Sequence, residues 1–246
     1  MNHKRAIRLL IGLVLVFAAA LVNGESLNLV DNFGGHHLNT RHFSDLDGAF
    51  VVEHGVVRRS GDEGIYSEDR RYVTTIRSDY LAFDWTYEVT FRSPTDGPPD
   101  ILFIGMGSGR PDPTYFNEPA NSLTFRIHQG WIDGRVDVAA HPIAPQFTYF
   151  AEAIGALPGH PGRAYTEYTA QISKTGDSIE FSICEVVPKP SQSSNSARGC
   201  QPLFSHSIAD IAEAAPFLSM GNSYLFFGNG SGSYSYTKAK IDVRRR

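Results

Sequence analysis

The sequence predicts an all-β protein in which two antiparallel sheets pack face to face as a jelly-roll sandwich. Three observations predict this class: segments of alternating apolar and polar residues recur along the chain, turn sequences separate them, and helical patterns are scarce. Alternation with a period of two places one set of side chains in a core and the other set on the opposite face. Strands joined by short turns form antiparallel sheets.

The chain begins with a segment that we predict to be a secretion signal. Basic residues within 4–8 precede an apolar run over 9–22, and the small residue Gly24 stands where a signal peptidase would cut. The apolar run is short for a membrane span, and no second such run follows. We expect a signal peptide over 1–24 and one secreted or periplasmic domain over 25–246, without a transmembrane segment. An N-terminal membrane anchor is the alternative.

The charge balance argues against nucleic acid as a partner. Outside the predicted signal, 19 Lys and Arg face 26 Asp and Glu, so the domain carries a net charge of −7. A domain this acidic is poorly suited to bind a phosphate backbone. The one basic run, over 244–246, is typical of a solvated chain end.

Candidate strands follow one another through the domain, from an early strand near 27–33 to a closing strand near the C-terminus. The clearest alternating segments cover 84–92, 122–128, 167–173, 179–183 and 239–243. Turn sequences occur at 96–99, at Asp133-Gly134 and at 174–177. We expect the apolar parity in the core; it includes Phe91, Phe125, Ile127, Phe181 and Ile241. The residues of the opposite parity are expected not to be buried; they include Arg92, Arg126 and Lys240.

Three further segments depart from simple alternation. The run 101–106 is apolar on both parities, which predicts a strand covered on both faces, with Gly105 allowing another backbone to approach closely. A helix is expected over 208–215, after Ser207 as the N-terminal cap and before Pro216. A second short helix is considered for 150–156.

The two cysteines, Cys184 and Cys200, are predicted to form a disulfide. The 15 residues between them are rich in Pro, Ser, Asn and Gly, the composition of a loop. A secreted protein meets an oxidising compartment, in which such a pair would close the base of the loop. Free thiols or a metal site are the alternatives, although two cysteines without a nearby histidine do not complete a tetrahedral zinc site.

Four segments together resemble a known superfamily. They are Asp31-Asn32-Phe33, the strand 85–91, the hairpin 168–183 through Thr175-Gly176-Asp177, and the segment 226–230 before the last strand. Their order is similar to that of the concanavalin A-like lectin/glucanase superfamily, which includes laminin-G-like modules. The resemblance covers nearly the whole domain. It implies a jelly roll and, as the favoured function, extracellular recognition of a glycan.

Members of that superfamily commonly hold carbohydrate on the concave sheet, so polar strand faces are the candidate site. The expected ligand-binding residues are Glu88, Arg92, Arg126, His128 and Tyr236. They supply bidentate donors, a group that titrates near neutrality and an aromatic ring, all of which suit a sugar. An ordinary solvated surface is the alternative, since outward strand faces of any sandwich are polar.

An enzyme on the same fold is the second hypothesis, either a polysaccharide lyase or a glycoside hydrolase. The glucanase signature is missing, because no Glu is followed two positions later by Asp. The alginate-lyase branch is more similar and implies Arg92, His128, Tyr236 and Lys238 as catalytic candidates. The chain departs from that branch at Arg126-Ile127-His128, where the family has Gln-Ile-His. A protein-binding module of laminin-G type is the third hypothesis.

Calcium is the one cofactor that the sequence suggests. Asp112, Asn117 and Glu118 lie in one loop and carry the oxygen ligands that calcium prefers. Turn chemistry is the alternative, since Asp and Asn often bond to their own backbone. The histidines His36, His37 and His42 are close in sequence, but their spacing is not specific for zinc.

Overall fold

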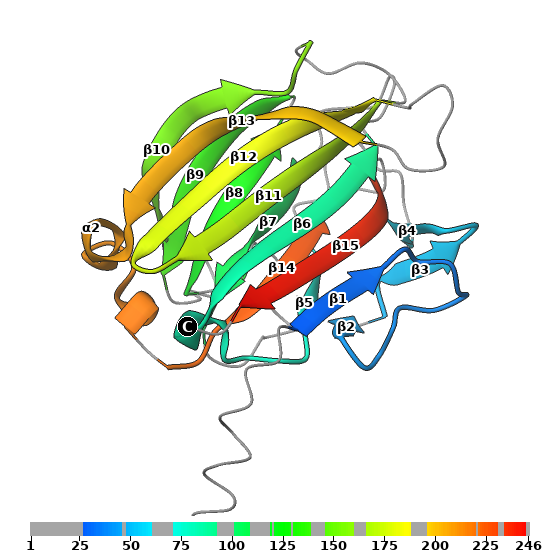
Figure 1. Ribbon diagram of the computed structural model, residues 1–246, viewed down its shortest axis with the longest axis horizontal. Helices are drawn as coiled ribbons and strands as arrows, with labels where there is room; N and C mark the ends of the chain where they lie inside the picture. Colours follow the sequence, from blue (N-terminus) through cyan, green and yellow to red (C-terminus); the bar gives the residue numbers. More distant parts are fainter. Residues whose placement is uncertain are drawn as a thin grey trace, which may run out of the picture.

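The computed structural model is a sandwich of two antiparallel β-sheets, which confirms the predicted class (Figure 1). It describes residues 27–45, 48–60, 71–92, 101–108, 119, 121–128, 130–138, 146–159, 166–187, 196–219, 221–230 and 234–244. The predicted signal peptide and the proposed calcium ligands Asp112, Asn117 and Glu118 lie outside these residues. Within them, no helix is long and apolar enough to cross a membrane.

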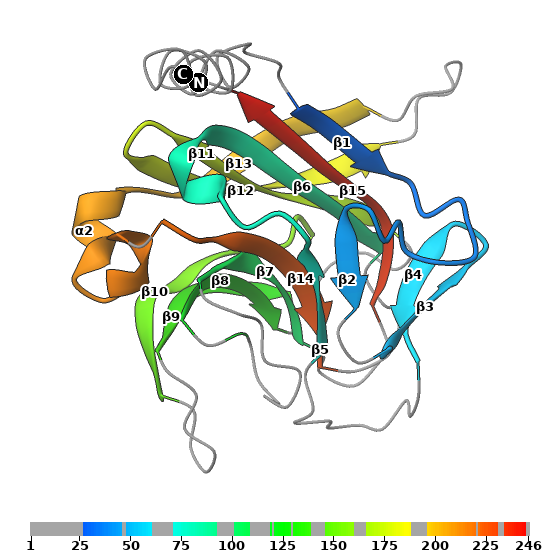
Figure 2. The ribbon, with the colours of Figure 1, turned by 90° about the horizontal axis from the view of Figure 1, so that it is seen from below.

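Each sheet is built from strands that are distant in sequence. In spatial order, the eight-stranded sheet contains β13 (Ser196–Ser207), β12 (Ser178–Val187), β11 (Glu167–Thr175), β6 (Asp84–Arg92), β15 (Ser235–Arg244), β4 (Val56–Arg59) and β3 (Phe50–Glu53), and β1 (Leu27–Asp31) also pairs with β15. The seven-stranded sheet contains β10 (Gln146–Ala156), β9 (Trp131–Val138), β8 (Ser122–His128), β7 (Ile101–Gly107), β14 (Tyr224–Asn229), β5 (Arg71–Thr75) and β2 (Phe43–Asp45). Figure 2 shows the two sheets as stacked layers, with β10 and β2 at opposite edges of the lower one.

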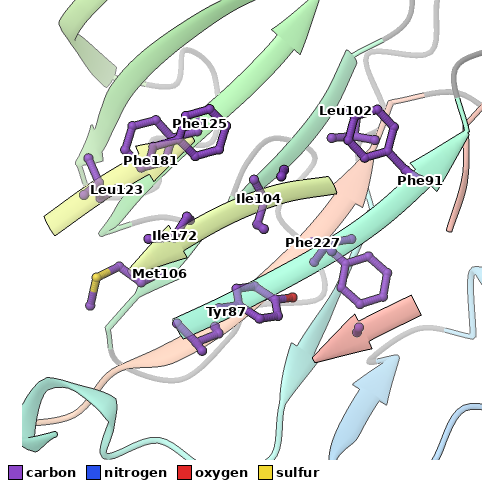
Figure 3. Close-up of a cluster of buried hydrophobic side chains, with 14 of the residues drawn as sticks. Tyr87, Phe91, Leu102, Ile104, Met106, Leu123, Phe125, Ile172, Phe181 and Phe227 are labelled. Atoms are coloured by element: carbon purple, nitrogen blue, oxygen red, sulfur yellow. The ribbon is translucent and has the colours of Figure 1, made fainter. Parts of the chain in front are cut away.

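The core lies between the sheets and follows the predicted parity. Phe91, Phe125, Ile127, Phe181 and Ile241 are all buried. The rings of Phe125 and Phe181 stack with centroids 4.4 Å apart, so they join a strand of one sheet to a strand of the other (Figure 3). On the opposite parity, Arg92 is exposed and Lys240 is partly exposed, as expected. The prediction that Arg126 is not buried is wrong: its side chain is buried, although it points away from this core.

Strand β7 is covered on both faces, as its apolar run predicts. Every residue of β7 after Ile101 is buried. A Cβ atom on Gly105 would lie 2.3 Å from the carbonyl oxygen of Leu123 and 2.5 Å from the ring of Phe226. Gly105 therefore permits close packing between β7 and its neighbours, which confirms its expected role.

Tyr236 lies in the core and not on the outward face. The register between β15 and β6 shifts between Tyr236 and Lys238. This irregularity adds one residue to β15, which places Tyr236 on the same side as Ala239 and Ile241. Its ring lies 4.6 Å from that of Phe227, and its side chain is fully buried. Strict alternation assigned Tyr236 to the wrong face because a bulge inverts the parity.

Two local expectations are wrong and one is confirmed. The segment 150–156 belongs to strand β10, where pairing with β9 prevails over local helical pattern. Asp133-Gly134 lies inside β9, and the turn between β8 and β9 instead contains Gly130 at φ 79°. Helix α2 (Ile208–Ala212) begins where predicted, since the Ser207 hydroxyl accepts a hydrogen bond from the Asp210 N–H at 3.0 Å. It ends at Ala212, three residues earlier than predicted, and Pro216 opens the 3₁₀ helix η2 (Pro216–Ser219).

The predicted disulfide is present between Cys184 of β12 and Cys200 of β13. It ties β13, the edge strand of its sheet, to its neighbour. Cys184 is buried and Cys200 is exposed. Cys184 has the parity opposite to the core residue Ile183, so the disulfide holds the edge strand from the outer face of the sheet.

Replacing both cysteines with alanine should lower the free energy of unfolding by about 3 kcal/mol, because the crosslink restricts the unfolded chain. Urea unfolding of the wild type and of the double variant measures this difference. Adding a reductant should destabilise the wild type and leave the double variant unchanged. Equal stability of the two proteins without reductant would contradict the prediction.

Candidate functional site

Strands β8 and β9 present polar side chains on the outer face of the seven-stranded sheet, the face directed away from the eight-stranded sheet. The opposite parity is buried between the sheets and comprises Leu123, Phe125, Ile127, Ile132 and Val136. Because side chains alternate along a strand, the outer face receives Ser122, Thr124, Arg126, His128, Trp131, Asp133 and Arg135. One end of this face thus combines an indole, an imidazole, a guanidinium and a carboxylate.

Four of these residues form two cross-strand pairs, which we name the β8–β9 platform. Arg126 lies opposite Asp133, and His128 lies opposite Trp131. The Nη2 atom of Arg126 donates to Asp133 Oδ2 at 2.9 Å, and its Nε atom donates to Oδ1 at 3.2 Å. The side chain of Arg126 is 10% exposed and that of Asp133 is 17% exposed. This double hydrogen bond orients both side chains.

Trp131 is the exposed member of the platform. The residue is 55% exposed, and no other Phe, Tyr or Trp residue whose burial the structure describes is exposed. Trp131 directly follows Gly130, so its indole lies at the end of the β8–β9 hairpin. Trp131 is not among the residues predicted from the sequence, because the turn was expected at Asp133-Gly134. With the turn at Gly130, the alternation of β9 assigns Trp131 and Asp133 to one face.

An aromatic cluster occupies the middle of the same outer face. It consists of Tyr72, Phe103, Tyr224 and Phe226, all of which are buried. The ring of Phe226 lies about 6 Å from each of the other three. Burial raises the pKa of the Tyr224 hydroxyl well above its ordinary value. The buried rings of this cluster pack on the outer face of the sheet and are not accessible to a ligand. Among the described residues, the accessible indole is that of Trp131 on the platform.

The structure does not bring the sequence-predicted ligand residues together. It places Arg126 and His128 on the seven-stranded sheet, whereas Glu88 and Arg92 lie on β6 in the other sheet. Tyr236 is buried in the core, where a glycan cannot reach it. The five residues expected to bind a ligand therefore do not form one site. Alternation does not report which strands are neighbours, because that depends on long-range pairing.

The outer face of the eight-stranded sheet is instead a surface of paired charges. Arg92 Nη2 lies 3.1 Å from a carboxylate oxygen of Glu167. Lys240 lies 2.5 Å from Asp242 and 3.9 Å from Glu88, and the hydrogen bond to Asp242 raises the pKa of Lys240. Lys238 is on this face, opposite Thr90. These exposed pairs contribute little to stability and are typical of a solvated sheet.

A pocket of about 630 Å³ lies at the opposite edge of the sandwich, between β2 and β3. Its lining includes Phe43, Phe50 and Val52, with His36 and His37 beside them. Within the described residues, no group of three or more His, Cys, Asp or Glu side chains could hold a metal ion. The proposed calcium loop at 112–118 lies outside those residues and stays a prediction.

No protein-family model and no curated protein sequence matches the chain. A structure reported for endo-acting O-glycanases of prominent human gut microbiota, which initiate mucin breakdown, matches with a TM-score of 0.54 and 11% identity, covering 89% of this chain and 99% of that chain. The acidic lectin of winged bean in complex with methyl-α-D-galactose matches with 0.51 and 8%, covering 89% and 99%. The CBM2 module of the evolved Dit of Lactobacillus casei BL23 phage J-1 matches with 0.51 and 12%, covering 92% and 99%. The chain thus has the concanavalin A-like jelly-roll fold.

Proposed function

We propose that this protein recognises a glycan outside the cytoplasm and binds it on the β8–β9 platform. The observation that carries the proposal is the exposed indole of Trp131 beside the ordered Arg126–Asp133 pair and His128. An indole offers a flat apolar surface to the C–H face of a sugar ring, while carboxylate and imidazole groups hydrogen-bond its hydroxyls. A lectin and a carbohydrate-binding module among the solved structures of the same fold support this proposal.

An extracellular location is supported by two features of the chain. The disulfide between Cys184 and Cys200 is the kind of crosslink that forms in oxidising compartments. The segment 1–24 has the composition of a secretion signal. Both features agree with a ligand that belongs to a cell surface or an extracellular matrix.

Trp131→Ala should weaken glycan binding by about tenfold to a hundredfold, because the variant loses the apolar area that covers the sugar ring. A glycan array identifies the ligand, and titration calorimetry measures its affinity for both proteins. The matched control is Ile76→Ala, since Ile76 is also 55% exposed but lies beside the pocket at the other edge. Unchanged affinity in Trp131→Ala, or a loss confined to Ile76→Ala, would contradict the proposal.

Catalysis is the second candidate, in view of the fold shared with endo-acting O-glycanases. The four residues suggested by the lyase comparison do not form one constellation: Arg92 and Lys238 lie on one sheet, His128 on the other and Tyr236 in the core. An enzyme would therefore have to use other residues. Release of reducing ends or of unsaturated uronates from the bound glycan would favour an enzyme, and capture of a protein ligand would favour the laminin-G-type alternative.

A further inference from the structure

We infer that the β8–β9 platform selects a neutral glycan over an acidic one. This inference rests on the proposed function, because it concerns the ligand class of the same site. It depends on the pairing of Arg126 with Asp133, on the partial exposure of Asp133 on the same strand as Trp131, and on the burial of Arg135.

The guanidinium of Arg126 already has a carboxylate partner. Two of its nitrogens donate hydrogen bonds to the two carboxylate oxygens of Asp133. An arginine binds the carboxylate of a uronate through the same pair of hydrogen bonds. A glycan carboxylate could take this place only by displacing Asp133. Displacement would leave a partly buried Asp133 without its counter-charge, which is strongly unfavourable.

Asp133 is the accessible acceptor of the platform. An ionised carboxylate has about four lone-pair sites on its two oxygens, more than the hydrogen bonds from Arg126 use. The remaining sites suit sugar hydroxyls, which donate hydrogen bonds. A uronate or sulfate at the same place would bring a second anion to a guanidinium that Asp133 already neutralises, and it could not donate the hydrogen bonds that the remaining sites accept, which discriminates against it.

Arg135, the other arginine on β8 and β9, adds no accessible positive charge to the platform. Arg135 is 1% exposed, so its charge does not reach the surface next to Trp131. Arg126 and Asp133 neutralise each other, and the indole of Trp131 is uncharged. Within the described part of β8 and β9, the accessible surface therefore offers the indole of Trp131, the imidazole of His128 and carboxylate oxygens of Asp133 that accept hydrogen bonds from sugar hydroxyls. These groups fit a neutral hexose or N-acetylhexosamine.

The test uses matched oligosaccharides that differ only at C6. Mannotetraose is compared with the tetramer of mannuronate, and cellotetraose with its C6-oxidised tetraglucuronate, by calorimetry alongside a broad neutral array. Neutral ligands should bind at least about tenfold more tightly than their acidic partners, with an affinity that changes little with salt, because no ion pair forms with the ligand. Binding of the preferred ligand should depend on Trp131.

A charge variant tests the origin of the selectivity. Asp133→Asn should weaken binding of the neutral ligand and shift the neutral-to-acidic affinity ratio toward the acidic one, because it removes the negative charge that pairs with Arg126. The control is Glu180→Gln, an exposed carboxylate on the other sheet, which should leave the ratio unchanged. Should Asp133→Asn not fold, the wild-type ratio and its salt dependence decide the matter.

The outcomes separate the two proposals. Tighter binding of the acidic tetramers that is abolished by Trp131→Ala would overturn the neutral selectivity and leave the proposed function standing. Binding that survives Trp131→Ala, or no binding to any glycan of the array, would overturn the proposed function itself. A neutral preference lost in Trp131→Ala supports both.

Discussion

Replacing Phe125 with alanine should lower the free energy of unfolding by about 3 to 5 kcal/mol. Phe125 of β8 is fully buried, stacks on Phe181 of β12 at 4.4 Å and meets the edge of the Phe204 ring of β13 at 5.1 Å. These contacts connect the two sheets, so truncation loses both buried area and aromatic packing. The cavity cannot collapse easily, because both sheets are held by extended ladders.

Urea unfolding at constant pH measures this loss. Ser205→Ala is a suitable control, because Ser205 lies on β13 next to Phe204 but is exposed, and its replacement should change stability by less than about 0.5 kcal/mol. Arg126→Ala is not a neutral control, although its strand parity alone suggests one. Its removal would leave Asp133 without a partner in a mostly buried position. Equal losses in Phe125→Ala and Ser205→Ala would refute the assignment of the core.

The parts of the fold that could be predicted are those that depend on local pattern. Alternation in β6, β8 and β11 correctly separates core from outer side chains at Phe91 and Phe125, and the doubly apolar run of β7 correctly predicts cover on both faces. The disulfide follows from the number of cysteines and the loop between them. In each case one short segment contains the whole signal.

The errors come from features that no single segment encodes. The parity of Tyr236 is inverted by a bulge against β6, and Arg126 is buried in a pair with Asp133 of the neighbouring strand. The predicted ligand-binding residues do not lie together, because β6, which carries Glu88 and Arg92, and β8, which carries Arg126 and His128, belong to different sheets. Sheet membership arises from pairing across long sequence separations, which a one-dimensional pattern does not contain.

Placement of the turn decided whether the candidate site could be found. An Asp-Gly pair is a common turn signal, and it drew the turn to Asp133-Gly134. In the structure this pair lies inside β9, where Asp133 faces Arg126 and Gly134 lies opposite Phe125. Moving the turn to Gly130 extends β9 by four residues, 131–134, and adds Trp131 to the outer face. One misplaced turn therefore concealed the residue on which the proposed function depends.

Gly105→Ala should destabilise the protein by more than about 3 kcal/mol, at the upper end of the cost of overpacking. The added Cβ atom would lie 2.3 Å from the carbonyl oxygen of Leu123, well inside van der Waals contact. That oxygen belongs to the backbone of β8, which is paired with β7 on one side and with β9 on the other. It cannot move without disturbing these hydrogen-bonded ladders, and the Phe226 ring blocks the other direction.

The matched control for this substitution is Gly221→Ala, since a Cβ atom on Gly221 would meet nothing within 4 Å. Its replacement should change stability by no more than about 0.5 kcal/mol. Thermal and urea unfolding of both variants separate the clash from a general effect of replacing glycine. Equal stability of the two variants would show that β7 and β8 do not approach as closely as described. Because β8 also carries Arg126 and His128, a partly folded Gly105→Ala protein should lose glycan affinity together with stability, whereas Trp131→Ala should lose affinity alone.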